Sequence, residues 1–395
     1  MLSRTHVGLL GGLVALAPFA IDMYLPATPA LAADLGVTAG QAGQSISVFF
    51  LGLAAGQVAA GPLSDRWGRR PLALGGLVVF TIAALLASRT TNFQLLLLFR
   101  LTQAFGACAA MVAARAVVSD RLNSLGAARI FSILALIGGT APILAPLIGV
   151  ALVRAGDWRT IFYAMAGFSA SLGIVGLVQL PETRSASTAA QARAEHPVRA
   201  YWTLLTNRRL LGFLIAAACN GAALITYIAD SPAVLMGAYK ITPLSFSLLF
   251  SFNAVGLVAA SLINRRLLRT RVVEQALRGS ARNAVILAVL FLIFAATGAG
   301  GPLGLIVLLF LAVASYAPVQ ANTLAGGLAV DGLRSGSTAA LFGSASFALG
   351  AVMSWVAGQF HDHTPNALAA IIALCLLGSA ASVLLMVAPS PSAPR

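Results

Sequence analysis

The chain has 395 residues, of which 59% are hydrophobic and 9% are charged. An average soluble domain carries about 25% charged residues, so a soluble fold of this size would lack the charges needed to cover its surface. This excludes a cytosolic enzyme and a nucleic-acid-binding module, although the net charge is +14. Cys108, Cys219 and Cys375 lie far apart inside apolar runs, so neither a disulfide framework nor a cysteine metal site is expected. The composition indicates an integral membrane protein.

Apolar runs long enough to cross a bilayer recur along the whole chain. A membrane-spanning helix needs about 20 mostly apolar residues, and residues 285–296 lack the alternation of a β-barrel strand. The first run also resembles an export signal, but it stays apolar beyond Asp22, so we favour a retained helix. We predict an all-α membrane protein of twelve transmembrane helices in two pseudo-symmetric six-helix bundles. The helices are expected to start near Val7, Gln41, Leu72, Asn92, Ala127, Trp158, Leu210, Pro243, Asn283, Pro302, Ser335 and Pro365.

The longest polar stretch divides the chain into two halves. Residues 1–181 are predicted to form the first bundle, residues 182–207 a solvated cytoplasmic linker, residues 208–388 the second bundle, and residues 389–395 a disordered tail. Most of the 25 basic residues fall in the segments on the side of the two termini, which places both termini in the cytoplasm. The short loops leave no room for a catalytic domain. We therefore expect no enzyme activity and no cofactor. A proton gradient is the expected energy source.

Residues 61–71, after the second predicted helix, combine charges with helix breakers. Gly61 and Gly68 bracket a group that contains Asp65, Arg66 and Arg69. The arginines alone would mark the cytoplasmic side, but a compact turn with both signs of charge favours a latch between helix ends. In the second half, the segment 264–266 keeps the basic charge without the acid or the glycines. We therefore expect an asymmetric latch.

Five further segments carry distinctive patterns besides residues 61–71. They are residues 21–29, 100–106, 138–149 with Gly138, Pro142, Pro146 and Gly149, 157–162 and 181–183. Residues 61–71 resemble motif A of the major facilitator superfamily, residues 100–106 its motif B and residues 138–149 its antiporter motif. The other three segments resemble its bicyclomycin/chloramphenicol resistance (Bcr/CflA) drug:proton antiporters. The resemblance implies that Asp120 joins the network of Asp65 and Arg69, and that an antiporter motif occupies the fifth helix.

Two charged residues are expected at similar depths inside the membrane. Asp22 lies in the outer part of the first helix, and Arg100 lies about eight residues into the fourth. A charge at a helix centre costs about 2.5–3.5 kcal/mol on insertion scales, so each needs a partner, water or a function. We predict that Asp22 carries the transported proton and that Arg100 sets its proton affinity, as the resemblance also implies. An interfacial acid and a snorkelling arginine are the alternatives.

Polar and aromatic residues in other predicted helices are candidates for a substrate cavity at the interface of the repeats. Asp230, beside Ser231 and Pro232, would favour cationic substrates, although ordinary helix packing is an alternative for each residue. The candidates are Tyr24, Phe49, Asn220, Tyr227, Asp230, Asn253 and Asn322, with Tyr316 and Phe347 as further polar or aromatic positions.

These features predict a proton-driven multidrug efflux antiporter of a bacterial-type inner membrane. It would export small, largely apolar drugs by alternating access, as a monomer whose partners are drugs, protons and the lipid bilayer, with no nucleic acid. Export of an endogenous metabolite such as an amino acid is the alternative within transport. A polytopic membrane enzyme is disfavoured by the short loops.

Overall fold

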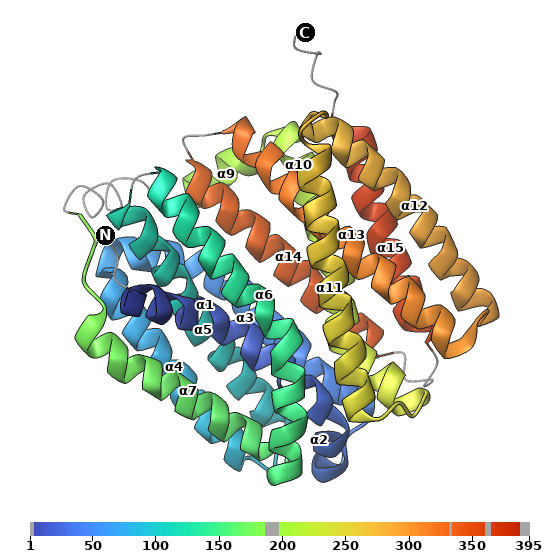
Figure 1. Ribbon diagram of the computed structural model, residues 1–395, viewed down its shortest axis with the longest axis horizontal. Helices are drawn as coiled ribbons and strands as arrows, with labels where there is room; N and C mark the ends of the chain where they lie inside the picture. The colour runs from blue at the N-terminus through green and yellow to red at the C-terminus, as the bar shows by residue number, and fades with distance from the viewer. Residues whose placement is uncertain (1–3, 123, 186–196, 332–333, 360–364, 388–395) are drawn as a thin grey trace, which may run out of the picture. The chain divides into compact units, whose positions relative to one another are not determined.

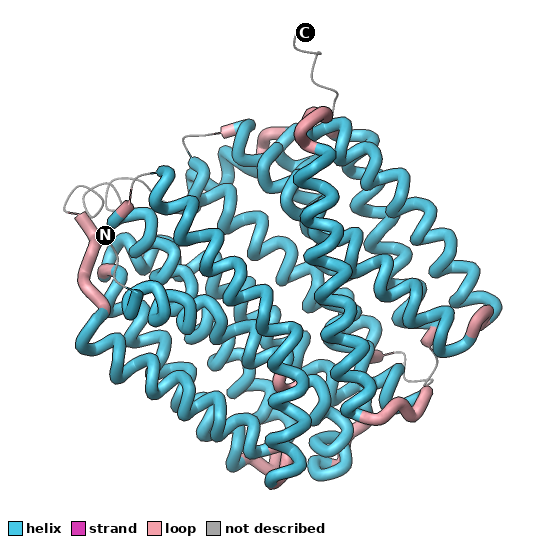
Figure 2. The backbone as a smooth tube through the Cα atoms, viewed as in Figure 1, coloured by secondary structure: helices cyan, strands magenta, loops and turns pink. Residues whose placement is uncertain are grey.

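The computed structural model describes residues 4–122, 124–185, 197–331, 334–359 and 365–387. These residues form helices joined by short loops (Figure 1), and no strand occurs among them (Figure 2). Within these ranges, twelve helical spans are long and apolar enough to cross a membrane. The predicted all-α membrane protein with twelve such helices is confirmed.

The helices group into two compact units. The first contains Met1–Thr38 and Val48–Pro197, and the second contains Ala39–Ser47 and Val198–Arg395. Residues 39–47, the start of a helix expected in the first bundle, belong to the second unit. The expected linker includes a helix, α9 (Pro197–Leu205). The rest of the linker at residues 186–196, and the expected tail at 389–395, lie outside the described residues.

The first unit contains a broken first helix followed by five longer helices. The elements are α1 (Arg4–Asp22), η1 (Leu25–Ala27), α2 (Thr28–Leu35), α3 (Ala39–Trp67), α4 (Arg69–Arg89), α5 (Phe93–Arg121), α6 (Ser124–Ala155) and α7 (Arg159–Gln179). Within this unit, α4 packs between α5 and α7, and α1 packs against α5 and α6.

In the second unit, the first long helix is regular at its start and irregular at its end. The elements are α10 (Arg208–Pro232), the π-helix η2 (Ala233–Ala238), α11 (Pro243–Leu267), α12 (Val273–Thr297), α13 (Gly301–Val330), α14 (Ser335–Ala357) and α15 (Asn366–Met386). Here α10 packs against α13, α14 and α15. Helix α12 begins well before the expected start at Asn283. Arg278 and Arg282 favour a helix, but they lower the local hydropathy from which the start was predicted.

The breaks in α1 and α10 each lie beside a buried acid. Helix α1 ends at Asp22, and a buried turn leads into η1 at Leu25. Helix α10 becomes a π-helix directly after Pro232. Proline has no N–H to continue the helical ladder. Irregular backbone at membrane depth persists only where protein or an aqueous cavity satisfies it, so both breaks are candidate sites.

Candidate functional site

The acid at the break in α1 is buried and has no protein partner among the described residues. Asp22 is 4% exposed, and no hydrogen bond or ion pair from the described part of the chain reaches its carboxylate. Gly149 of α6 lies against the same break. A Cβ at Gly149 would collide with the Met23 carbonyl group and press on Pro26. This antiporter-motif glycine therefore lets α6 pack directly on the turn that follows Asp22.

Arg100 of α5 is the basic group of this region. Its side chain is completely buried, and Nη1 donates to the carbonyl oxygen of Ala20 at 3.2 Å and to Gln103 Oε1 at 2.8 Å. Within the described residues, Nε and Nη2 have no hydrogen-bond partner. Burying a charge without a counter-ion is costly, so other contacts must stabilise this guanidinium.

Three aromatic rings supply those contacts. The guanidinium carbon of Arg100 lies 4.3 Å from the ring centroid of Phe49, 4.7 Å from that of Tyr24 and 5.7 Å from that of Phe162. A desolvated cation–π contact contributes about 2 kcal/mol. Tyr24 and Phe49 were expected in a substrate cavity, and the structure places both rings against Arg100. The site also includes Phe162, which sequence reasoning missed.

Asp22 and Arg100 are joined indirectly. Among the described residues no ion pair forms between them, and the connection runs through the carbonyl of Ala20, two residues before Asp22. Sequence reasoning also missed Gln103, although its i, i+3 spacing from Arg100 on one helix was a usable signal. The arrangement holds an acid and a base near one break without neutralising either by direct contact.

The acid of the second unit has hydroxyl partners instead. Asp230 of α10 is 6% exposed, and its Oδ2 accepts a hydrogen bond from Ser354 Oγ of α14 at 2.8 Å. Ser354 Oγ lies 2.7 Å from Ser47 Oγ, in the part of α3 that belongs to this unit. The Ser231 hydroxyl is buried and has no partner within the described ranges. Asp230 therefore ends a short chain of hydroxyl groups.

The other polar candidates on α10 are bonded within the second unit. Tyr227 stacks on Phe250 at a centroid distance of 5.6 Å, and its hydroxyl accepts from Asn253 Nδ2 at 2.7 Å. Asn220 donates to the carbonyl oxygen of Tyr316 at 3.0 Å. The structure thus brings Tyr227 and Asn253 together, as expected for one site, while their role toward a substrate stays a prediction.

Asn322 of α13 has a structural partner near the end of α11. It exchanges two amide hydrogen bonds with Asn264, at 3.2 and 3.0 Å. Both side chains are buried. This reciprocal pair joins α11 to α13 next to the segment that lacks the acid and glycines of motif A.

The charges of motif A meet at one end of the first unit. The Arg69 side chain, 5% exposed, contacts Asp65 Oδ1 at 2.5 Å and Asp120 Oδ2 at 2.9 Å. Ser64 Oγ accepts a third hydrogen bond at 3.1 Å, and Thr183 Oγ1 donates to Asp120 at 2.9 Å. One arginine therefore ties the end of α3 to the end of α5, as the resemblance implied for these three charged residues.

Glu182 extends this network to the end of α7, which sequence reasoning missed. Its carboxylate accepts the backbone N–H groups of Arg69 and Arg70, at the N-terminus of α4, at 3.0 and 3.2 Å. It also accepts those of Thr183 and Arg184. Burial alone raises the pKa of Glu182, but these four backbone hydrogen bonds lower it below its ordinary value. A carboxylate from a distant segment thus caps α4.

The turn expected over residues 61–71 is largely helical, which corrects the sequence-based prediction. Helix α3 continues to Trp67, and Gly68 alone forms the break, with φ of 110°. A Cβ on Gly68 would collide with Glu182, whereas Gly61 lies within α3 and faces open space. The side chain of Arg66 is exposed, and its carbonyl oxygen accepts from Arg184. Gly68, rather than Gly61 or the Arg66 guanidinium, shapes the turn.

The remaining antiporter-motif residues lie inside α6. Pro142 and Pro146 interrupt its hydrogen-bond ladder. A Cβ at Gly138 would meet open space, so close packing explains Gly149 and not Gly138. The structure therefore separates a packing glycine at the α1 break from a loosened middle of α6.

The chain is similar to known transporters along most of its length. The Multidrug resistance protein MdtL of Citrobacter koseri is 34% identical over 224 residues, which are 57% of this chain and 56% of that protein. The Bicyclomycin resistance protein homolog of Haemophilus influenzae is 28% identical over 346 residues, 87% of this chain and 86% of its own length. These relatives confirm the resemblance to bicyclomycin-type drug transporters.

The fold is also shared with a solved structure. The crystal structure of a D-xylose-proton symporter superposes with a TM-score of 0.75, covers 97% of each chain and is 14% identical. The family model of the Major Facilitator Superfamily matches residues 10–336. With its twelve apolar helices and its motif A charges assembled around Arg69, this chain belongs to the Major Facilitator Superfamily of membrane transporters.

Proposed function

We propose that the protein is a proton-driven efflux antiporter for small, largely apolar drugs, located in a bacterial-type inner membrane with both termini in the cytoplasm. The names of the relatives support a role in drug resistance, since they describe a multidrug resistance protein and a bicyclomycin resistance protein homolog. The basic residues concentrated on one side of the predicted helices support the orientation.

The proposed proton coupling rests on the burial of Asp22 and on its lack of a protein partner among the described residues. Its carboxylate is buried at a helix break and has no partner among the described residues. An ionised carboxylate without a partner is penalised in a dry site, so binding of a proton or a cation removes a large cost. Proton and substrate that compete for this one acid drive each other's release, which is sufficient for exchange.

Arg100 tunes this competition in the proposal. Its two unpartnered guanidinium nitrogens are fully buried, and its third nitrogen holds the backbone next to Asp22. A nearby positive charge favours the ionised acid and hence proton release. The aromatic rings of Tyr24, Phe49 and Phe162 stabilise the cation without neutralising it, which leaves its charge available to the acid.

The Arg69 network acts as a conformational latch in the same proposal. It ties α3, α4, α5 and the segment after α7 at one end of the first unit. We expect it to stabilise the outward-open state, so that opening toward the cytoplasm requires its rearrangement. The burial of Arg69, which is 5% exposed and contacts two acids, supports this role. A conformation in which a buried arginine loses a partner is strongly destabilised.

Accumulation of a fluorescent cationic drug in cells tests the function. Cells that make the protein should accumulate less dye than cells with an empty vector, and a protonophore should abolish the difference. Equal accumulation with and without the protein would contradict drug efflux. A difference that survives the protonophore would contradict proton coupling and leave efflux standing.

A further inference from the structure

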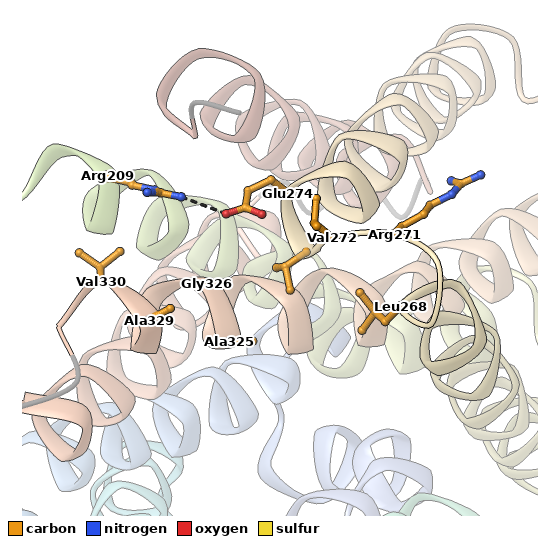
Figure 3. Close-up of a pocket in the computed structure, with 10 residues that line it drawn as sticks. Arg209, Leu268, Arg271, Val272, Glu274, Ala325, Gly326, Ala329 and Val330 are labelled. Atoms are coloured by element: carbon orange, nitrogen blue, oxygen red, sulfur yellow. Dashed lines mark hydrogen bonds and ion pairs between the residues drawn. The ribbon is translucent and has the colours of Figure 1, made fainter. Parts of the chain in front are cut away.

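A cavity of about 420 Å³ opens at the end of the second unit where α10 and α12 begin (Figure 3). Arg209 lies at one end of this cavity and Arg271 at the other (Figure 3). Between them, Leu268 and Val272 line one side and Ala329 of α13 lines another. Arg209 is directed at Glu274, whereas the guanidinium of Arg271 points outward at the rim, and apolar side chains lie between the two arginines (Figure 3).

The charges around the cavity are strongly one-sided. Arg209 and Arg271 line it. Four further exposed arginines lie close to its lining residues in the chain, on α10 and at or just after the end of α11: Arg208, Arg265, Arg266 and Arg269. Glu274, 15% exposed in its side chain, is the acid that lines the cavity, and it accepts a hydrogen bond from Arg209 at 2.9 Å. The excess of basic residues on the cytoplasmic side of a membrane protein explains the exposed arginines. It does not explain a partly apolar cavity in which an acid is hydrogen-bonded to one of these arginines.

Helix α9, which directly precedes α10, adds an independent observation. Leu204 is 2% exposed and faces the protein, while Trp202 is 70% exposed and Leu205 is 39% exposed. A short amphipathic helix with an exposed tryptophan beside basic residues is typical of a segment that lies in the headgroup region of a membrane. The basic cavity thus lies next to an element suited to the lipid interface.

We propose that this cavity binds the headgroup of an anionic phospholipid. The phosphate would pair with Arg209, in competition with Glu274, and with Arg271 at the rim, while the acyl chains would cover Leu268 and Val272. Basic pockets between transmembrane helices bind anionic headgroups in this way, and exposed basic residues are attracted to anionic leaflets. The site depends on the membrane location and not on the transported drug or proton.

Lipid retention by the purified full-length protein tests the proposal. Native mass spectrometry should show more retained phosphatidylglycerol than phosphatidylcholine of the same acyl chains. Arg209→Ala and Arg271→Ala should each weaken retention of phosphatidylglycerol about fivefold, and Arg129→Ala, which removes an exposed arginine of the first unit, should leave it unchanged. Glu274→Gln should strengthen retention, because it removes the competitor for Arg209.

The opposite effects of Arg209→Ala and Glu274→Gln distinguish binding from damage to the fold. Equal retention of both lipids, or retention of phosphatidylglycerol that no variant changes, would overturn the proposal. Full displacement of phosphatidylglycerol by inorganic phosphate at equal concentration would also overturn it, since the site would then recognise a free anion. No drug or proton gradient is present in this assay, so its failure would leave the proposed efflux function untouched.

Discussion

Helices α1 and α10 are both broken beside a buried acid, and the two acids have different surroundings. Asp22 has no partner of its own in the described ranges, and the buried Arg100 contacts the carbonyl of Ala20 two residues before it, whereas Asp230 accepts a hydrogen bond from Ser354. A hydroxyl donates to a carboxylate and accepts from a carboxylic acid. Asp230 is therefore satisfied in either protonation state, while Asp22 depends on what binds to it. This contrast is the reason we propose proton coupling at Asp22, in the first unit.

The two units also differ in charge where the first carries motif A and the second carries the segment that matches it in sequence. In the first unit Arg69 joins two acids, and Glu182 accepts four backbone N–H groups. In the second unit two neutral amides, Asn264 and Asn322, bond to each other. Charged groups respond to protons and salt, and amides do not. The first unit thus carries a charged network at the end where the second unit carries a neutral amide pair.

Apart from loss of Asp22 itself, loss of the charge on Arg100 should produce the largest effect. Arg100→Ala should reduce active efflux about tenfold at neutral pH and shift the transport optimum to higher pH, because the proton on Asp22 becomes harder to remove. Arg100→Lys, which keeps the charge and loses the planar fork, should fall between wild type and alanine. The measurement is drug efflux from proteoliposomes against pH. An unshifted optimum for Arg100→Ala would show that Arg100 does not tune the acid.

Breaking the Arg69 network should have a smaller effect. Asp65→Asn should slow transport about threefold to fivefold at normal protein levels, since Asp65 is 41% exposed and Asp120 still holds Arg69. Cysteines introduced on the cytoplasmic side should become more accessible to a thiol label. Arg66→Gln is the control, because only the Arg66 carbonyl contacts the network. Equal losses in both variants would reduce the motif to a topology signal.

The comparison predicts a selective effect at Asp230. Asp230→Ala should weaken export of cationic drugs about threefold more than export of neutral drugs, because one buried negative charge is removed. Drug-induced proton release should persist in this variant. Ser354→Ala removes the hydroxyl partner and keeps the charge, so it should preserve the preference for cations. Equal losses for both kinds of drug would place Asp230 outside the substrate site.

Glu182 gives the smallest effect, with a defined pH dependence. Its pKa is lowered in the folded protein by backbone hydrogen bonds, so its stabilisation is present above the ordinary Glu pKa of about 4.3 and is lost as the pH falls through its folded value. Glu182→Gln should lower Tm by about 2 °C at pH 7. The gap should shrink below about pH 4. A gap that is constant with pH would mean that the charge does not matter.

The sequence predicted the helices well because apolar length is a local property. It also placed Asp65, Arg69 and Asp120 together, since the motif resemblance supplied their pairing. It failed where distant segments meet: Glu182 caps α4 from 113 residues away, and Phe162 reaches Arg100 from α7. The helix-breaking residues also placed Gly61 in a turn, although the proline and glycine near the end of α3 are accommodated within the helix. Such contacts depend on tertiary packing, which no local pattern encodes.

Proton release from the detergent-solubilised protein on drug addition tests the central claim most directly. Wild type should release protons when a cationic drug binds, and Asp22→Asn, which mimics the protonated acid permanently, should release none. Asp34→Asn is the matched control in the same span, because Asp34 already pairs with Arg159 at 2.8 Å, and it should release protons as wild type does. Proton release by Asp22→Asn equal to that of wild type would contradict the assignment and direct the search to Asp230.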